Sequence, residues 1–333
     1  MTRRVSLLVA IAALVVVNGL VVSCGSAGQP ETAQTVKLAM GYVPNIQFAP
    51  FYVAVDKGYF ADEGIQVTFD YGWETDLLKL VGNDELQFAI ASGDQVILAR
   101  SQGLPVVYVM NWYRRFPVSI VSLAEAGIRQ PRDLVGRRVG TPVPYGASYI
   151  GLRALLDAVG LKDTDIEVAF IGYNQVGAIS EGQVDAGVCY AMNEPVQMEA
   201  GGAKLDIIQV ADYANLVSNG LITNDKSLSE RSQLVQGMVQ AAMRGLAYTL
   251  DHPDEAYDIT LKFVPEMATN EAVSRAVLAK SFEFWTAAPG ELGRSVPDEW
   301  RASQQIMQQM GLVGSEGQVE DMFTNRFAEK AEK

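Results

Sequence analysis

Aromatic side chains gather at the predicted loop ends of this sequence, where they could form stacking surfaces for a flat ligand. The candidates are Tyr42, Phe48, Trp73, Trp112, Tyr113, Tyr145, Tyr149, Tyr173 and Tyr190. Such rings bind planar heterocycles by offset stacking, which contributes about 0.5–1.5 kcal/mol per ring pair beyond area burial. Some of these rings must belong to the core instead. We place Trp112 and Tyr113 first for ligand contact, because they end a predicted strand beside a hinge.

Polar candidates lie near the starts of predicted helices, where free backbone N–H groups also point at a ligand. They are Asn45, Gln47, Asp94, Ser148, Asn174, Asn193 and Glu194. Asn45 and Gln47 carry donors and acceptors that suit ring carbonyls and nitrogens. Asn45 and Asp94 alternatively only cap their helices. Glu194 is alternatively an ordinary acidic residue in a first helical turn.

Residues typical of catalysis or metal binding are scarce. The chain has two cysteines and one histidine. Cys189 lies in an apolar run and is expected to be a buried thiol, and His252 lies in a polar turn before Pro253. We expect no metal site and no cofactor. The net charge of −13 argues against a nucleic-acid partner.

The first residues differ in kind from the rest. Two arginines precede an apolar run, 5–22, and Ser23-Cys24 follows it. This pattern resembles a secretory signal with a bacterial lipobox, so we expect a signal peptide, 1–23, lipid on Cys24 and a tether, 24–35. A transmembrane anchor is the alternative, since about 18 apolar residues could just span a bilayer. We expect an extracytoplasmic, lipid-anchored bacterial protein.

Strand-like and helix-like segments alternate from residue 36 onward, as in a doubly wound α/β sheet. The expected strands are 36–42, 65–71, 85–91, 105–112, 138–140, 166–171, 185–190 and 206–209, and the segment 216–223 is expected to return the chain to the first set. The expected helices are 49–58, 76–81, 95–101, 149–159, one within 177–181, one from 193, then 230–250, 253–264, 270–285, 297–310 and 320–327.

The alternation occurs in two sets, which predicts two α/β lobes with a ligand between them. Lobe 1 is expected to comprise 36–120 and 221–333, and lobe 2 to comprise 121–220. The crossings near 118–123 and 217–223 are expected to act as hinges. The C-terminal helices are expected to cover lobe 1.

Two long stretches carry a resemblance to a known family. They are KLAMGYVPNIQFAPFYVAVDKGYFADEGIQV (37–67) and DELQFAIASGDQVILARSQGLPVV (84–107). With the lipobox, they resemble periplasmic solute-binding proteins of ABC transporters. Within these the chain is similar to the thiamine-pyrimidine-precursor binders (NMT1/THI5-like) and their sulfonate- and nitrate-binding relatives. The segments GASYIGLRALL (146–156) and NEPVQ (193–197) narrow the resemblance toward the pyrimidine branch.

The resemblance implies a two-lobed periplasmic-binding-protein fold (type II-like), closure around a ligand and delivery to an ABC permease in the membrane. We expect a monomer. The loop 145–148 resembles the anion loop of the sulfonate and nitrate relatives and would offer Ser148 to hydroxyls or a carbonyl. Tyr173 and Asn174 would complete the second-lobe wall. The fungal enzymes of this family need a cysteine-rich iron site and a lysine–histidine pair, so we expect no enzyme.

One departure bears on the ligand. Pyrimidine-binding members carry an Asn-x-x-His pattern where this chain has Asn45-Ile46-Gln47-Phe48. An aromatic ring in place of histidine favours a larger, flatter ligand, and a bacterial subgroup of the family carries riboflavin. The expected ligand is therefore riboflavin. A thiamine pyrimidine precursor is the first alternative; a small sulfonate or nitrate-like anion, which needs a cleft Arg or Lys, is the second.

Overall fold

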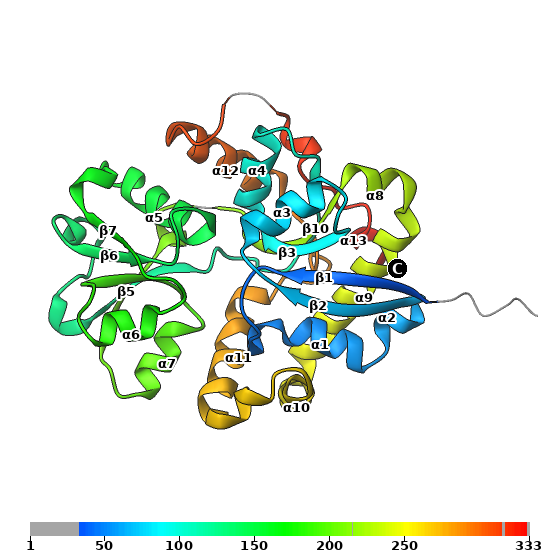
Figure 1. Ribbon diagram of the computed structural model, residues 1–333, viewed down its shortest axis with the longest axis horizontal. Helices are drawn as coiled ribbons and strands as arrows, with labels where there is room; N and C mark the ends of the chain where they lie inside the picture. Colours follow the sequence, from blue (N-terminus) through cyan, green and yellow to red (C-terminus); the bar gives the residue numbers. More distant parts are fainter. Residues whose placement is uncertain (1–32, 215, 315–316, 332–333) are drawn as a thin grey trace, which may run out of the picture. The chain divides into compact units, whose positions relative to one another are not determined.

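Two five-stranded sheets, each with helices around it, make up the compact unit that follows residue 32 (Figure 1). The computed structural model describes residues 33–214, 216–314 and 317–331. The predicted signal peptide and Cys24 lie outside the described residues. Within the described ranges, no helix combines the length and the apolar character needed to cross a membrane.

The first sheet has four strands that run in one direction and one that runs against them. In spatial order they are β2 (Ile65–Tyr71), β1 (Gln34–Met40), β3 (Phe88–Ser92), β10 (Asn219–Asn224) and β4 (Val106–Asn111). β1 is parallel to β2 and β3, with Leu38 opposite both Phe69 and Phe88. β10 is antiparallel to β3 and β4. The fold therefore places the late strand β10 in the middle of an early sheet.

The second sheet repeats this plan. Its order is β7 (Glu167–Phe170), β6 (Arg138–Thr141), β8 (Ala186–Tyr190), β5 (Val118–Leu123) and β9 (Leu205–Gln209). β6 is parallel to β7 and β8, whereas β5 is antiparallel to β8 and β9. Each sheet is therefore mainly parallel, with one reversed strand in fourth place. These two sheets confirm the predicted α/β fold class.

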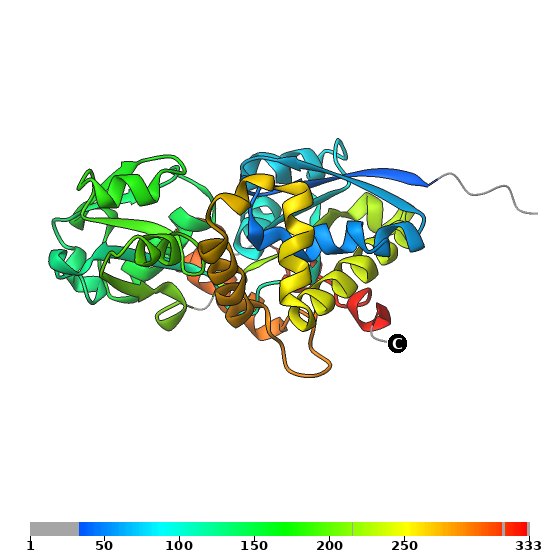
Figure 2. The same cartoon turned by 90° about the horizontal axis from the view of Figure 1, so that it is seen from below.

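The helices lie mainly around the two sheets. They are α1 (Ala49–Asp56), α2 (Tyr59–Asp62), α3 (Glu74–Gly82), α4 (Gly93–Ser101), α5 (Gly146–Ala158), α6 (Gln175–Ser180), α7 (Glu194–Ala200), α8 (Asp225–Glu230), α9 (Ser232–Asp251), α10 (Pro253–Phe263), α11 (Glu271–Trp285), α12 (Pro297–Gln309) and α13 (Ala328–Ala331). The 3-10 turns used below are η1 (Ile46–Phe48), η4 (Asp163–Asp165), η6 (Pro265–Asn270) and η7 (Val319–Asp321). Figure 2 shows α10 and α11 from below, and α11 contacts α7 beside the second sheet.

Alternating side chains of β1 separate two cores, as expected for a strand covered on both faces. Leu38 and Met40 belong to one cluster, with α1 and α9, whereas Ala39 belongs to another, with α3 and α4. α1 and α9 approach closely at Gly245, where an added Cβ would lie 2.2 Å from the Pro50 carbonyl oxygen. This packing fixes the helix start of α1 beside the end of β1.

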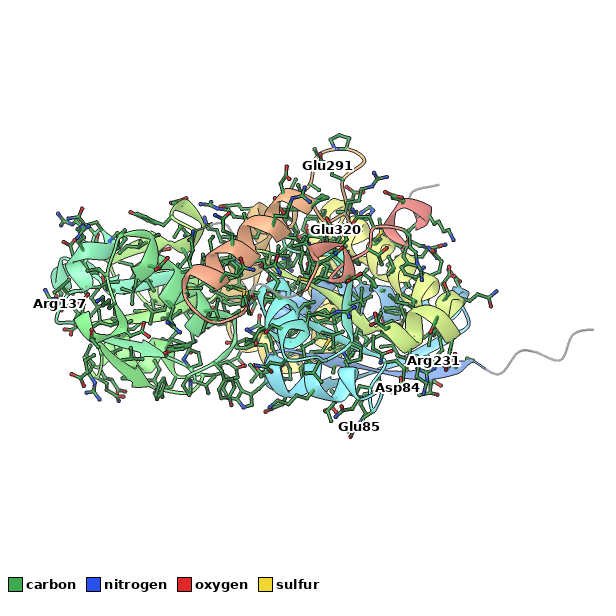
Figure 3. All side chains as sticks on the ribbon, turned by 90° about the horizontal axis from the view of Figure 1, so that it is seen from above. Asp84, Glu85, Arg137, Arg231, Glu291 and Glu320 are labelled. Atoms are coloured by element: carbon green, nitrogen blue, oxygen red, sulfur yellow. The ribbon has the colours of Figure 1, made fainter. Side chains whose placement is uncertain are left out.

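Charged side chains lie on the outside of this layered structure (Figure 3). Asp84, in the turn before β3, has a φ of 60°. Its carboxylate pairs with Arg231 at 2.6 Å and with Lys226 at 2.7 Å. These ion pairs hold the pKa of Asp84 well below its usual range. They tie the α3–β3 turn to the chain that follows β10.

The structure differs from the sequence-based expectations at three segments. Val118–Leu123, expected as a hinge, is the strand β5, and the second expected crossing overlaps β10. Both are buried strands that pair on two sides. The chain instead passes between the sheets within 112–117 and 210–218. The predicted lobe limits at 120/121 and 220/221 fall inside β5 and β10; the assignment to two lobes that move remains a prediction.

The expected helix 320–327 is wrong. Only η7 and the later α13 are helical there, and Phe323 forms an isolated bridge with Tyr108 of β4. The Thr324 backbone N–H donates to the Tyr108 carbonyl oxygen at 2.9 Å. Because these backbone groups bond to an edge strand, they are not available for helical hydrogen bonds.

Candidate ligand-binding site

A pocket with a volume of about 80 Å³ is lined by residues from both sheets' layers. Its walls come from the segments after the carboxyl ends of β1, β2 and β4 and after those of β6, β7 and β8. In open α/β sheets, ligands bind outside the carboxyl ends of the strands. This volume is below the usual range of small-molecule sites, roughly 300–1,000 Å³.

Most of the predicted site residues line this pocket. They are Tyr42, Gln47, Phe48, Trp73, Trp112, Tyr113, Tyr145, Ser148, Tyr173, Tyr190, Asn193 and Glu194. Four others do not: Asn45, Asp94, Tyr149 and Asn174. The structure therefore brings together segments that are distant in the sequence, such as Tyr42 and Glu194, which are 152 residues apart.

The four residues outside the pocket have local explanations. Asn45 caps η1, since its Oδ1 accepts from the Gln47 backbone N–H at 3.0 Å. Asp94 is fully buried in the first turn of α4. Tyr149 follows Ser148 on α5, and successive helical residues point about 100° apart. Asn174 is exposed just before α6.

Sequence reasoning missed four polar residues of the lining: Glu74, Thr75, Gln175 and Asn219. Glu74 is the first residue of α3, and the rule that selected Glu194 at a helix start would have selected it too. Asn219 lies in β10, inside a segment that is predicted as a returning crossing and hinge. No local signal marks Asn219, because its place depends on β10 returning to the first sheet.

Glu74 lies in the wall formed by the first sheet. Its Oε1 accepts from Asn219 Nδ2 at 3.0 Å and its Oε2 from Ser92 Oγ at 3.1 Å. An added Cβ at Gly41 would lie 2.5 Å from Glu74 Cγ, so the glycine makes room for this side chain. Burial first, and the nearby Asp94 carboxylate second, raise the pKa of Glu74 to about 8. Glu74 is therefore protonated at neutral pH.

Glu194 lies in the opposite wall and is equally buried. Its Oε1 accepts from the Tyr42 hydroxyl at 3.2 Å and from Asn193 Nδ2 at 3.0 Å. Its Oε2 accepts from the Tyr190 backbone N–H at 2.9 Å. Burial raises the pKa of Glu194, and these donors oppose the shift. Tyr42 belongs to the first sheet's layer, so its hydrogen bond joins the two walls.

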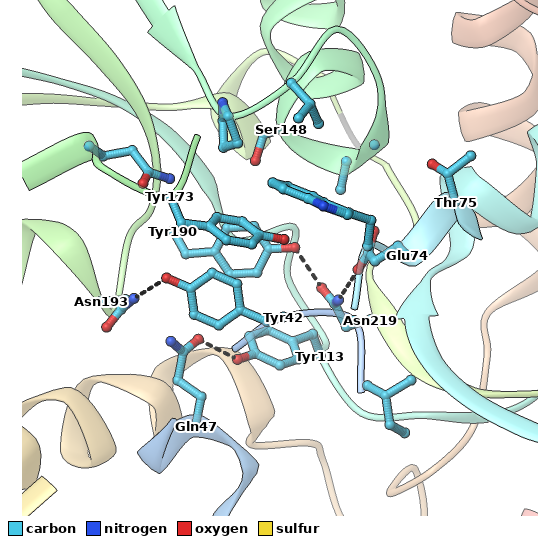
Figure 4. A pocket seen from close by; sticks show the side chains of 18 of the residues that line it. Tyr42, Gln47, Glu74, Thr75, Tyr113, Ser148, Tyr173, Tyr190, Asn193 and Asn219 are labelled. Carbon is cyan, nitrogen blue, oxygen red and sulfur yellow. Dashed lines mark hydrogen bonds between the residues drawn. The ribbon is translucent and has the colours of Figure 1, made fainter. Parts of the chain in front are cut away.

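Two further hydrogen bonds order the polar lining, and all four labelled partners appear in Figure 4. The Tyr190 hydroxyl donates to Asn219 Oδ1 at 3.3 Å, and Asn219 in turn donates to Glu74. The Tyr113 hydroxyl donates to Gln47 Oε1 at 3.2 Å. The hydrogen bonds that link Tyr190, Asn219 and Glu74 connect the second sheet to the first, from β8 to β10.

Aromatic rings from the two walls stack directly on each other. Trp73 and Tyr173 have ring centroids 4.3 Å apart and an interplanar angle of 20°. Tyr145 meets Trp73 edge-on at 6.4 Å, and Tyr42 meets Tyr173 edge-on at 4.7 Å. Tyr145 and Tyr173 are also among the exposed large side chains. These rings therefore form an accessible stacking surface at the pocket mouth.

Trp112 and its neighbours are mostly core. Trp112 is 2% exposed and packs against Phe48, Phe51 and Trp285 with ring centroids 5.0–5.8 Å apart. Tyr113 is also 2% exposed. Among the described residues, Trp112 Nε1 finds no hydrogen-bond partner. Both residues nevertheless belong to the lining of the pocket.

Cationic side chains are absent from the described lining of the pocket, which contains no lysine, arginine or histidine. Cys189 is buried, and burial raises its pKa well above the usual value. His252 lies exposed between α9 and α10. In the part of the chain that the structure describes, no cluster of three metal-binding side chains occurs. The arrangement suits an uncharged flat molecule with donors and acceptors on its edge.

Comparison with known proteins agrees with this geometry. The NMT1/THI5 like family matches residues 45–256. The chain is 41% identical over 304 residues to the riboflavin-binding protein RibY of Chloroflexus aurantiacus, covering 89% of this chain and 86% of RibY. It is 30% identical over 244 residues to the formylaminopyrimidine-binding protein of Halalkalibacterium halodurans, covering 71% and 72%.

A solved structure with the same fold is that of the alkanesulfonate-binding protein SsuA from Xanthomonas axonopodis pv. citri. It superposes with a TM-score of 0.70 over 87% of this chain and 98% of SsuA, at 14% identity. At that identity the likeness shows the fold alone. The fold is that of the periplasmic binding proteins, and the chain belongs to the NMT1/THI5 like family.

Proposed function

We propose that this protein captures riboflavin between its two lobes and delivers it to an ABC permease. The observation that carries the proposal is the aromatic pocket, whose described lining has no cationic side chain, in a chain 41% identical to a riboflavin-binding protein. In this proposal the protein works outside the cytoplasm, held to the membrane by lipid on Cys24, as a monomer.

The isoalloxazine ring would insert between Trp73 and Tyr173. Their ring centroids are now 4.3 Å apart, whereas a ring sandwiched between them needs about 7–8 Å, twice the optimal separation of about 3.5–4.0 Å between carbon atoms. Opening of the two walls would therefore admit the ligand, and reclosure would stack it on both rings. Because the ligand contacts both walls only in the closed state, binding shifts the equilibrium toward closure.

Polar side chains of the pocket would form hydrogen bonds with the edge of the ring. Asn219 and Gln47 present amides that can turn to donate or accept. Trp112 Nε1 offers a buried donor without a partner among the described residues, which suits a ring carbonyl. A carbonyl edge would satisfy this N–H, whose burial without a partner costs free energy.

We propose no enzymatic role. The family's synthases need iron and lysine–histidine chemistry, and the described pocket lining offers no lysine, histidine or cysteine for it. The residues present can bind and orient a ligand by stacking and hydrogen bonds. Closure and release would be the working steps.

A thiamine pyrimidine precursor is the second candidate. The observation that favours it is the Asn193–Glu194 pair, which could accept from an exocyclic amine, in a chain 30% identical to a formylaminopyrimidine-binding protein. A small sulfonate or nitrate is disfavoured, because an anion of this kind needs a cationic partner in the pocket.

Riboflavin fluorescence tests the proposal directly. We expect saturable quenching at micromolar protein and ligand, because stacking on Trp73 and Tyr173 quenches the flavin. Tyr173→Ala should weaken binding by about 10- to 100-fold, whereas Tyr213→Ala, at an exposed tyrosine outside the pocket, should not. Unchanged fluorescence, together with calorimetric binding of a formylaminopyrimidine, would replace riboflavin by the second candidate.

A further inference from the structure

A second hollow, of about 340 Å³, shares Asn193 with the pocket. It lies between η1 and the helices α6, α7 and α11, with η6 at its edge. Its polar members are mainly amides and hydroxyls, and its apolar members include Ile46 and Val277. Since both sheets' layers contribute to it, it is bounded by the same two walls as the pocket.

Two hydrogen-bonded amide pairs join the hollow to the pocket. Asn193 Nδ2 donates to the Tyr42 hydroxyl in the pocket at 3.2 Å, while Asn193 Oδ1 accepts from Gln197 Nε2 in the hollow at 2.9 Å. Gln47 lines the pocket and donates through Nε2 at 3.2 Å to Asn45 Oδ1, whose residue lines the hollow. Amide groups therefore lie on both sides of the boundary between the two cavities.

The chemistry of the hollow suits hydroxyl groups. Each hydroxyl can donate to one amide oxygen and accept from another amide N–H. Among its described lining residues there is no lysine, arginine or histidine, and the one charged member is Glu266. A phosphate monoester, with a charge of about −1.5 to −2 at neutral pH, would meet a carboxylate there and no cation.

We propose that this hollow is a subsite for an uncharged, polyhydroxylated chain attached to the ring that the pocket holds. The inference rests on the proposed function and makes it more specific. The pocket would bind the flavin ring, and the hollow would select the free polyol over its phosphate ester. Asn193 would contact the ligand where ring and chain meet.

A ligand series tests this with the wild-type protein. Lumiflavin carries the ring with a methyl group in place of the chain, riboflavin carries the polyol, and flavin mononucleotide carries its phosphate. We expect riboflavin to bind at least about tenfold more tightly than either of the others, as measured by fluorescence titration. Equal affinities of lumiflavin and riboflavin would overturn the subsite alone. Binding of none of the three would overturn the proposed function, and the subsite with it.

A substitution in the hollow gives an independent test. Thr269 is exposed in the 3-10 turn η6, so Thr269→Trp should fill the hollow without disturbing the core. Riboflavin affinity should fall to that of lumiflavin, while lumiflavin affinity stays within about twofold. The matched control is Thr164→Trp, at an exposed threonine in the 3-10 turn η4 outside both cavities. Equal losses for both ligands, or no loss for riboflavin, would contradict the subsite.

Discussion

Two carboxyl groups face the pocket from opposite walls, and each is the first residue of a helix. Glu74 begins α3 after β2, and Glu194 begins α7 after β8. Both are buried, and burial is the main reason that both pKa values are raised. They share position, residue type and burial, but their neighbours differ.

Glu74 has a second carboxylate beside it. Asp94 adds like-charge repulsion to the cost of burial, and together they raise the pKa of Glu74 to about 8. Glu194 receives hydrogen bonds from Tyr42, Asn193 and the Tyr190 backbone, which oppose the rise caused by burial. Hydrogen bonds from Ser92 and Asn219 do the same at Glu74. The comparison teaches that two buried acids at equivalent helix starts are distinguished by their neighbours, here by the Asp94 carboxylate that raises the pKa of Glu74 further.

The substitution of glutamate by glutamine, made at each of the two sites in turn, should show the largest difference between the two acids. Glu194→Gln replaces one of the two oxygens that accept these three hydrogen bonds by an amide nitrogen that cannot accept, so we expect it to lower the free energy of unfolding by about 1–3 kcal/mol. Glu74→Gln resembles the protonated carboxyl group of the folded protein and cannot ionise in the unfolded chain, so at neutral pH it should leave stability unchanged or raise it. Urea unfolding at neutral pH measures both. Equal losses for the two variants would show that the two surroundings do not distinguish these acids.

The pH dependence of stability should show a smaller but specific effect. The pKa of Glu74 is about 8 in the folded protein, above its ordinary 4.5. Between these values the unfolded chain has lost the proton while the folded protein keeps it, so the contribution of Glu74 to stability falls as pH rises and is level above about pH 8. Glu74→Gln removes this fall.

We therefore expect Glu74→Gln to gain stability relative to wild type from about pH 5 to about pH 8, by about 1 kcal/mol or more, since one pKa unit corresponds to about 1.4 kcal/mol. Urea unfolding across this range is the measurement. The control is Glu181→Gln, at an exposed glutamate. Parallel stability curves for wild type and Glu74→Gln would show that Glu74 titrates as an ordinary glutamate.

Asp94→Asn should give the smallest effect. It removes the second cause of the raised pKa of Glu74 and leaves the first, burial, in place. The pH above which stability stops falling should therefore drop below 8. It should stay above the ordinary pKa range of a glutamate, because burial still raises the pKa of Glu74. The same unfolding series on Asp94→Asn measures it. If this pH stayed the same in Asp94→Asn, the two carboxyl groups would not interact.

Local patterns were enough to find most of the elements and many of the pocket residues. Trp73 follows a strand and precedes a helix, so its place at a carboxyl end could be predicted. Trp112 shows the limit, because a ring at a strand end can also be core, and here it is nearly all core. Tyr149 shows another, since the face of a helix that meets the pocket depends on how the helix packs.

The sequence by itself determined the alternation of strands and helices, the shortage of catalytic side chains and the aromatic loop ends, because these depend on residue types and short spacings. The tertiary structure decided which wall each residue joins. It placed β10 in the first sheet and so brought Asn219 to Glu74. It also put Asp94 near Glu74, across two elements. Protonation depends on burial and on neighbours distant in sequence, and only the folded chain sets these.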